Sequence, residues 1–125
     1  MATPFDVRVA RVYDPPESTV GTRVLVDRLW PRGLAKATAA LDDWCKDIAP
    51  SNELRHWYAH DPDLFVQFTA MYRAELEDAD RAAALANLRE IGRHHTITLL
   101  TATKDLEISH AAVLANVIPE LDRQD

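Results

Sequence analysis

The stretch from Val24 to Gly33 constrains the fold more than any other part of this chain. Residues 24–26 are apolar, and their two β-branched valines favour a strand. An apolar run without alternation is typical of a strand buried on both faces, as in a parallel sheet covered by helices. The run then gives way to an acid, two arginines and a tryptophan, and Pro31 and Gly33 close it. The pattern predicts a strand over residues 23–29 that ends at a polar site.

Strand and helix signals alternate along the rest of the chain. Residues that favour helix N-caps precede four periodic segments, and these expected caps are Ser51, Asp61, Asp80 and Asp105. The expected elements are a strand over 5–13, a loop over 14–18, helices over 52–59, 62–77 and 81–93, a strand over 96–101, and a last helix from Asp105 to Pro119.

Residues 37–49 fit two interpretations. The alanine-rich segment 37–41 favours a helix by propensity. Alternation of Trp44, Lys46 and Ile48 fits one face of a strand instead. We favour a short strand around residues 43–48, which would end before Pro50 because the residue before a proline is restricted.

These elements predict one α/β domain over residues 1–125, with a small, mostly parallel sheet of three to four strands packed by about four helices. Ligands of such sheets bind beyond the carboxyl ends of the strands. If the strands over 23–29 and 96–101 are parallel neighbours, the loops 27–33 and 101–105 open on the same edge. The apolar last helix could close the core or contact a second copy, and the oligomeric state stays open.

Charge and composition exclude several classes of protein. The net charge is −6, with a balanced first half (residues 1–60) and all of the excess in residues 61–125, which opposes bulk binding to nucleic acid. No apolar window is long enough to span a membrane, and the first residues lack the features of a signal peptide. Cys45 is the only cysteine, which fits a reducing compartment. We therefore expect a cytoplasmic protein without a membrane partner.

Several strings of residues identify a family resemblance. The segments 24–33 and 44–51, the pair Leu54-Arg55, and the later residues 98–100 and His110-Ala111 resemble the YeaO-like family of small bacterial proteins. The resemblance covers nearly the whole chain. It implies a compact α/β domain of unknown function, and it implies no established reaction or cofactor.

Cationic residues near the expected sheet edge suggest an anion site. The guanidinium groups of Arg28 and Arg32 match phosphate or carboxylate in a bidentate manner, and Lys36 and the backbone N–H of Gly33 follow closely. The alternative is a structural ion pair of one arginine with Asp27 or Asp47. Further candidate ligand contacts are Trp30 in the same stretch, Lys46 in the expected strand around 43–48, and Lys104 and Asp105 in the loop after residue 101.

Two residues are candidates for proton transfer, and each has a structural alternative. Asp27 would be a general base, or else a buried carboxylate that accepts hydrogen bonds from backbone N–H groups. His110 would be a general acid or base, or else a helix histidine bonded to a carbonyl. Trp30 and Trp44 would stack a flat ligand, or else pack in the core.

No metal or cofactor is expected. The five histidines show no metal-ligand frame, and three glycines exclude a glycine-rich phosphate loop. Cys45 has no histidine partner nearby in the sequence and fits a buried apolar position.

Two functions remain open at this point. The first is the binding of a small anionic or nucleotide-like ligand at the edge formed by Asp27–Lys36 and Thr101–His110, with or without catalysis. The alternative is a non-catalytic interaction module with a protein or nucleic-acid partner.

Overall fold

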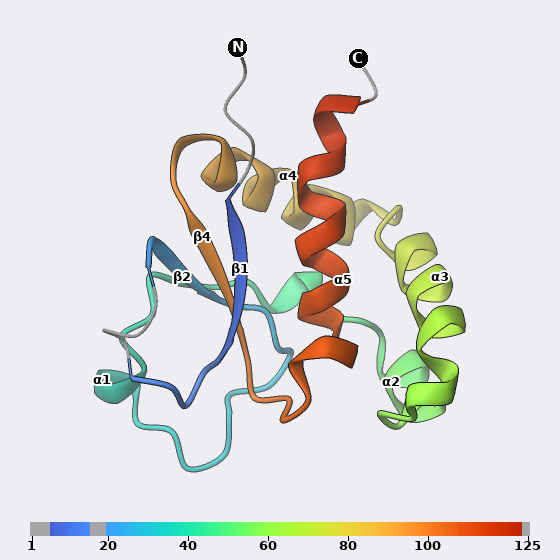
Figure 1. The fold of residues 1–125 in the computed structure, drawn as a ribbon, viewed down its shortest axis with the longest axis horizontal. Helices are drawn as coiled ribbons and strands as arrows, with labels where there is room; N and C mark the ends of the chain where they lie inside the picture. Colours follow the sequence, from blue (N-terminus) through green and yellow to red (C-terminus); the bar gives the residue numbers. More distant parts are fainter. Residues whose placement is uncertain (1–5, 16–19, 124–125) are drawn as a thin grey trace.

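Four parallel strands form the centre of the molecule (Figure 1), which we describe from a computed structural model over residues 6–15 and 20–123. The strands are β1 (Val7–Arg11), β2 (Thr22–Leu25), β3 (Asp43–Trp44) and β4 (Ile97–Thr101), in the order β1-β4-β2-β3. All five residues of β4 are buried, because β1 and β2 pair with it on either side. The expected α/β fold with a small parallel sheet is confirmed.

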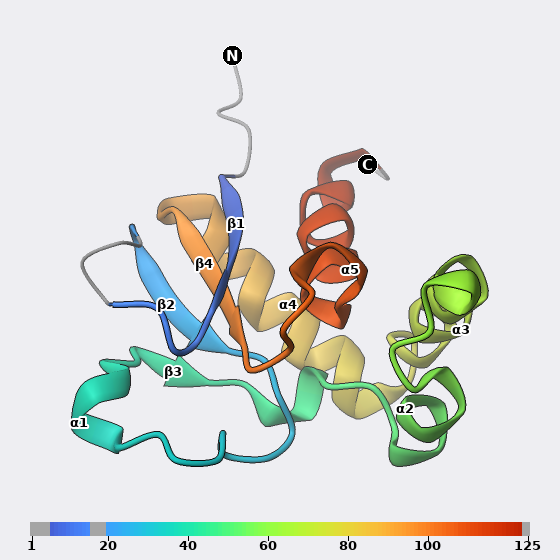
Figure 2. The same ribbon diagram turned by 60° about the horizontal axis from the view of Figure 1, so that its bottom comes forward.

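Helices cover this sheet mainly from one side (Figure 2). They are α1 (Lys36–Ala39), α2 (Asn52–Tyr58), α3 (Phe65–Glu75), α4 (Ala79–His94) and α5 (His110–Val117). Short 3-10 turns occupy Lys46–Ile48, Pro62–Leu64, Leu106–Ile108 and Ile118–Arg123. Helices α4 and α5 lie beside the sheet, and α2 and α3 lie farther out. Helix α2 and the start of α5 both lie near the carboxyl ends of the strands.

The core has two parts because successive strand residues face opposite sides of the sheet. Leu99 belongs to the larger cluster, together with Leu88 of α4 and Leu114 of α5, all of them fully buried. Leu100 belongs to a smaller cluster on the other face, against which Trp30 and other residues of the loop after β2 pack. Val24 and Leu25 of β2 are divided between the same two clusters, so the prediction that this strand is buried on both faces is confirmed.

Several element boundaries differ from the sequence prediction. Strand β2 ends at Leu25 rather than at residue 29, and Leu29 is 67% exposed, because the Asp27 carboxylate turns away to bind the loop after β4. Strand β1 covers Val7–Arg11 rather than residues 5–13, and residue 5 and most of the predicted loop 14–18 lie outside the described residues. Both interpretations of residues 37–49 contain a correct part, since α1 and the two-residue β3 both form there. The predicted strand around 43–48 is wrong beyond Trp44, because Lys46–Ile48 form a 3-10 turn.

Two of the predicted N-caps are wrong. Ser51 and Asp61 accept backbone N–H bonds as expected, from Leu54 and Asp63. Helix α4 is capped by Asp78, whose side chain accepts from the Arg81 N–H, rather than by Asp80.

The last helix also begins later than predicted. Ser109 caps α5 by accepting from the Ala112 N–H, while Asp105 makes no side-chain cap bond and precedes a 3-10 turn. The α-helix ends at Val117, two residues before Pro119, as predicted, and Pro119 lies in the 3-10 turn that follows. These shifts place His110 in the first turn of α5, at the carboxyl edge of the sheet.

Candidate functional site

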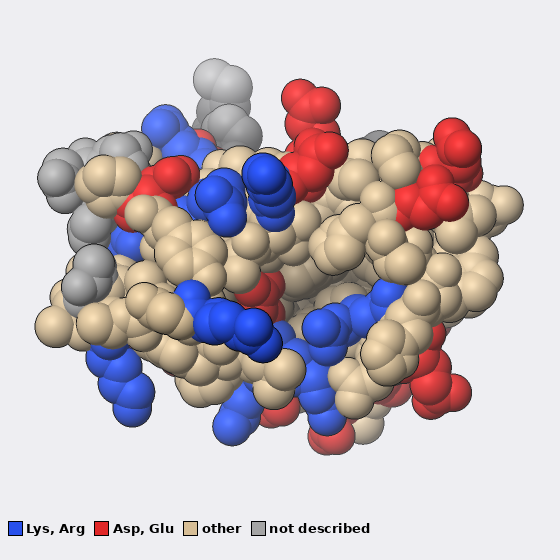
Figure 3. Space-filling model, turned by 90° about the horizontal axis from the view of Figure 1, so that it is seen from below, with Lys and Arg blue, Asp and Glu red and all other residues tan. Residues whose placement is uncertain are grey.

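A cavity of about 460 Å³ opens at the carboxyl edge of the sheet. Lys and Arg side chains lie around a hollow on this face, seen from below in Figure 3. The loops after β2 and β4 meet here, as predicted from their parallel pairing, because Val26 continues the ladder by donating its N–H to the Leu100 carbonyl at 3.0 Å. The cavity is lined by Asp27–Pro31, Ala49, Pro50, Arg55, His56, Tyr58, His60, Phe68, Ala102, Thr103, Ser109 and His110.

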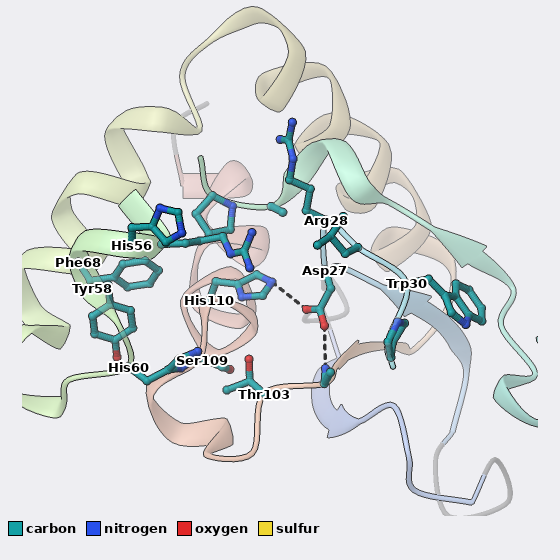
Figure 4. A pocket seen from close by; sticks show the side chains of 16 residues that line it. Asp27, Arg28, Trp30, His56, Tyr58, His60, Phe68, Thr103, Ser109 and His110 are labelled. Carbon is teal, nitrogen blue, oxygen red and sulfur yellow. Dashed lines mark hydrogen bonds and ion pairs between the residues drawn. The ribbon is translucent and has the colours of Figure 1, made fainter. Parts of the chain in front are cut away.

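The Asp27 carboxylate connects the three segments that form one wall of this cavity (Figure 4). Its Oδ1 accepts from the Thr101 hydroxyl at 2.7 Å and lies 3.3 Å from Nε2 of His110, and its Oδ2 accepts from the Ala102 N–H at 2.7 Å. The Asp27 side chain is only 16% exposed. The buried carboxylate therefore accepts a backbone N–H and holds the end of β2 against the end of β4 and the start of α5, as its structural interpretation requires.

The pKa of the Asp27 carboxyl lies below its ordinary value of 3.8. Burial is the largest single influence and raises the pKa, but the His110 hydrogen bond and charge, the Ala102 N–H and the Thr101 hydroxyl together lower it further. A carboxyl with a lowered pKa stabilises the fold while it is ionised, and this stability is lost as the pH falls through its folded-state pKa.

The pH dependence of folding should therefore depend on Asp27. We expect the gap in unfolding free energy between the wild type and Asp27→Asn to stay constant above about pH 5. The gap should shrink as the pH falls below 3.8, since the wild type then loses the benefit of its ionised carboxylate. Urea denaturation of both proteins at a series of pH values measures this gap in unfolding free energy. A gap that stays constant to about pH 3 would contradict a lowered pKa.

His110 has one ring nitrogen whose role is defined by its neighbours. Nε2 lies 3.0 Å from the Val26 carbonyl oxygen and 3.3 Å from the Asp27 carboxylate. Both neighbours can only accept, so Nε2 must carry a proton. The neutral ring is then the Nε2–H tautomer, and its Nδ1 is an acceptor. The carbonyl contact expected for a helix histidine is present alongside the contact to Asp27.

Cationic and imidazole side chains surround the mouth of the cavity. Arg28 follows β2 and extends away from Asp27 in Figure 4, while Arg55 and His56 come from α2 and His60 follows its end. All four residues are exposed. Neither arginine forms an ion pair with the residues that the structure describes, although Arg55 donates to Asn52 at 3.2 Å.

Aromatic rings form the apolar wall. The rings of Tyr58 and Phe68 stack with centroids 4.1 Å apart, and the Tyr58 hydroxyl donates to the Ile108 carbonyl. Trp30 and Trp44 instead pack edge to face, with ring centroids 5.4 Å apart. Their indole N–H groups donate to the Leu34 and Asp27 carbonyls, and both rings pack against the smaller core cluster, so core packing describes them better than a stacking wall for a ligand.

The structure gathers only part of the predicted site. Asp27, Arg28, Trp30 and His110 line the cavity. The other candidates do not line it, and these are Arg32, Gly33, Lys36, Lys46, Lys104 and Asp105. All six are exposed, and the Lys46 ammonium lies over the Trp44 ring, 5.3 Å from its centroid.

Sequence reasoning missed the contribution of α2. Arg55 enters the family resemblance, but the sequence pattern does not place Arg55, His56 or His60 at the expected site. His60 lies beyond the end of α2, and no cluster of three metal-ligating side chains occurs within residues 6–15 and 20–123. Ligands of parallel sheets bind beyond the carboxyl ends of the strands, and α2 follows β3, a third parallel strand. The same rule that located the loops after β2 and β4 therefore also points to α2.

Comparisons with known proteins identify the family of this chain. Residues 6–125 match a family model described as "Inactive DUF488-N3 subclade". An uncharacterized protein of Mycobacterium tuberculosis is 49% identical over 112 residues, covering 90% of this chain and 92% of that protein, and one of Mycobacterium bovis matches equally well. The uncharacterized protein YeaO of Escherichia coli is 40% identical over 117 residues, covering 94% of this chain and all of YeaO.

No solved structure matches the chain. No helix within the described ranges is long and apolar enough to cross a membrane. The family model covers nearly the whole chain, and the relatives are similar over almost their full lengths. The chain therefore belongs to the YeaO-like family of uncharacterised bacterial proteins, within the DUF488-N3 subclade described as inactive.

Proposed function

We propose that this protein binds a small anionic ligand in the cavity between β2, α2 and α5. The observation that carries the proposal is the presence of two guanidinium groups, from Arg28 and Arg55, at the mouth of one cavity in a chain of net charge −6. Guanidinium groups that have no carboxylate partner are suited to phosphate or carboxylate. A volume of about 460 Å³ lies within the range of small-molecule sites.

We favour binding without turnover as the form of this function. The matched subclade is described as inactive. Asp27 and His110 are also occupied with one another and with backbone groups, which is the arrangement of a structural brace. The anion site proposed here differs from the one inferred from sequence, because it uses Arg55 in place of Arg32, Lys36 and Lys104.

Thermal shift measurements test the proposal. Phosphate, sulfate, sugar phosphates and mononucleotides are added at rising concentration, and a ligand of the native state raises the melting temperature. We expect Arg28→Ala and Arg55→Ala each to lower the affinity for the tightest-binding ligand by about tenfold or more, because each removes one charge-assisted hydrogen bond.

Arg32→Ala is the matched control, since Arg32 is an exposed arginine outside the cavity. It should keep the wild-type response. A flat response of the wild type to the whole panel would overturn the proposal, as would a response that Arg32→Ala abolishes and Arg55→Ala leaves intact.

A further inference from the structure

The inner wall and the mouth of the cavity differ in hydrogen-bonding character, and this difference specifies the ligand further. The inference rests on the proposed function. Asp27 and His110, at the inner wall, have side chains only 16% and 12% exposed, whereas Arg28 and Arg55 at the mouth are exposed. Among the described residues that line the cavity, Asp27 is the only acidic one.

Hydrogen-bond donors of the inner wall are already used within the protein. Nε2–H of His110 is directed at Val26 and Asp27, which leaves Nδ1 of the neutral ring as an acceptor. The Ser109 hydroxyl donates to the Leu106 carbonyl at 2.8 Å and accepts from the Ala112 N–H at the start of α5.

The two threonines of the loop after β4 complete this pattern. Thr101 has one hydroxyl proton, and its 2.7 Å contact with the Asp27 carboxylate uses it. The Thr103 hydroxyl lies 3.1 Å from that of Thr101, and its oxygen keeps lone pairs that can accept from a ligand. The inner wall therefore offers acceptors: the Asp27 carboxylate, Nδ1 of His110 and the oxygen of Thr103.

An anion would be misplaced against this inner wall. Two like charges about 4 Å apart repel by roughly 4 kcal/mol at the effective dielectric constant of a protein surface site. The anionic group of a ligand must lie at the mouth, between the arginines. The opposite end of the ligand meets acceptors only, so it must carry hydrogen-bond donors such as hydroxyl groups.

We propose that the ligand is a small polyol that carries one anionic group, of which a glycerol or pentose phosphate is the simplest example. Its hydroxyl groups donate to two or more of the acceptors Asp27, His110 and Thr103, and its phosphate accepts from Arg28 and Arg55. The cavity of about 460 Å³ has room for a molecule of this size.

Calorimetric titration at pH 8, where histidine side chains are ordinarily neutral, separates this proposal from simple anion binding. The probes are glycerol 3-phosphate and ribose 5-phosphate, compared with butyl phosphate, which carries a phosphate and no hydroxyl group. We expect at least one hydroxylated ester to bind tenfold or more tightly than butyl phosphate. Thr103→Val should reduce this preference to below threefold and leave the affinity for butyl phosphate unchanged.

His110→Gln provides a second variant, because the glutamine amide keeps a donor for Val26 and Asp27 and removes the acceptor Nδ1. It should reduce the preference in the same way, with folding checked by circular dichroism. Equal affinity of all three esters in the wild type, with Arg55→Ala weakening each of them, would overturn the proposed polyol and leave the anion site standing. A preference that survives both Thr103→Val and a folded His110→Gln would also overturn it. Failure of all three esters to bind would overturn it together with the phosphate site at Arg28 and Arg55.

Discussion

Replacing Asp27 with alanine is expected to lower the free energy of unfolding by about 3–5 kcal/mol. The substitution removes a carboxylate that accepts from the Ala102 N–H and the Thr101 hydroxyl and that lies beside Nε2–H of His110. These donors stay largely buried with fewer partners, and a buried donor without its partner costs about 1–3 kcal/mol. Urea denaturation at pH 7 measures the change through the transition midpoint and slope.

Asp47→Ala is a suitable control, because Asp47 is an exposed aspartate in the 3-10 turn after β3. A surface substitution of this kind should change the free energy of unfolding by less than about 0.5 kcal/mol. Asp27→Asn should fall between the two, since it keeps one acceptor oxygen and loses the charge. A loss below about 1 kcal/mol for Asp27→Ala would contradict the bracing role, since this is the low end of the cost of one unsatisfied group.

The architecture was predictable from the sequence because its signals are strong and local. A continuous apolar run at 24–26 indicated a strand buried on both faces, and the parallel pairing of β2 with β4 then placed two polar loops on one edge. The acceptor role of Asp27 followed from the cost of burying a carboxylate. Each of these inferences depends on burial and on strand direction.

Boundaries and partners were harder to predict because tertiary contacts decide them. The predicted strand extended to residue 29, but strand β3 pairs with β2 over only two positions, and after Val26 the loop leaves the sheet to pack against the smaller core cluster. Asp80 and Asp105 are both good caps by propensity, and the neighbouring Asp78 and Ser109 take the role in the folded chain.

The cavity required information that spans the whole chain. Arg28 and Arg55 are 27 positions apart, and they share one cavity only because α2 follows β3 at the carboxyl edge. Lys36 and Lys104 were selected because they lie close in sequence to the predicted loops. Proximity in sequence does not determine side-chain direction in a loop, which explains why the anion site predicted from sequence includes residues that the cavity does not.

Alanine in place of Gly21 is expected to lower the free energy of unfolding by about 3 kcal/mol or more, the sum of two costs. Gly21 has a positive φ of 74°, a conformation that costs other residues roughly 1–2 kcal/mol. A Cβ atom at this position would also overlap the backbone carbonyl of Thr96, the residue before β4. That carbonyl accepts from the Thr22 N–H at 2.8 Å, so the overlap cannot be relieved without disturbing the first pair of the β2–β4 ladder.

Gly33→Ala separates the two costs, since Gly33 has a nearly identical φ of 76° and no atom within 4 Å of the position of a Cβ. Only the conformational term applies there, and we expect a loss of about 1 kcal/mol. Thermal and urea unfolding of both variants measure the difference. Equal losses of unfolding free energy at the two glycines would show that the backbone at Thr96 can move to make room for the added methyl group. The close contact of Gly21 with Thr96 would then not limit stability. A much larger loss at Gly21 would show that the close approach of β2 to β4, on which the position of the Asp27 brace and the cavity depends, tolerates no side chain.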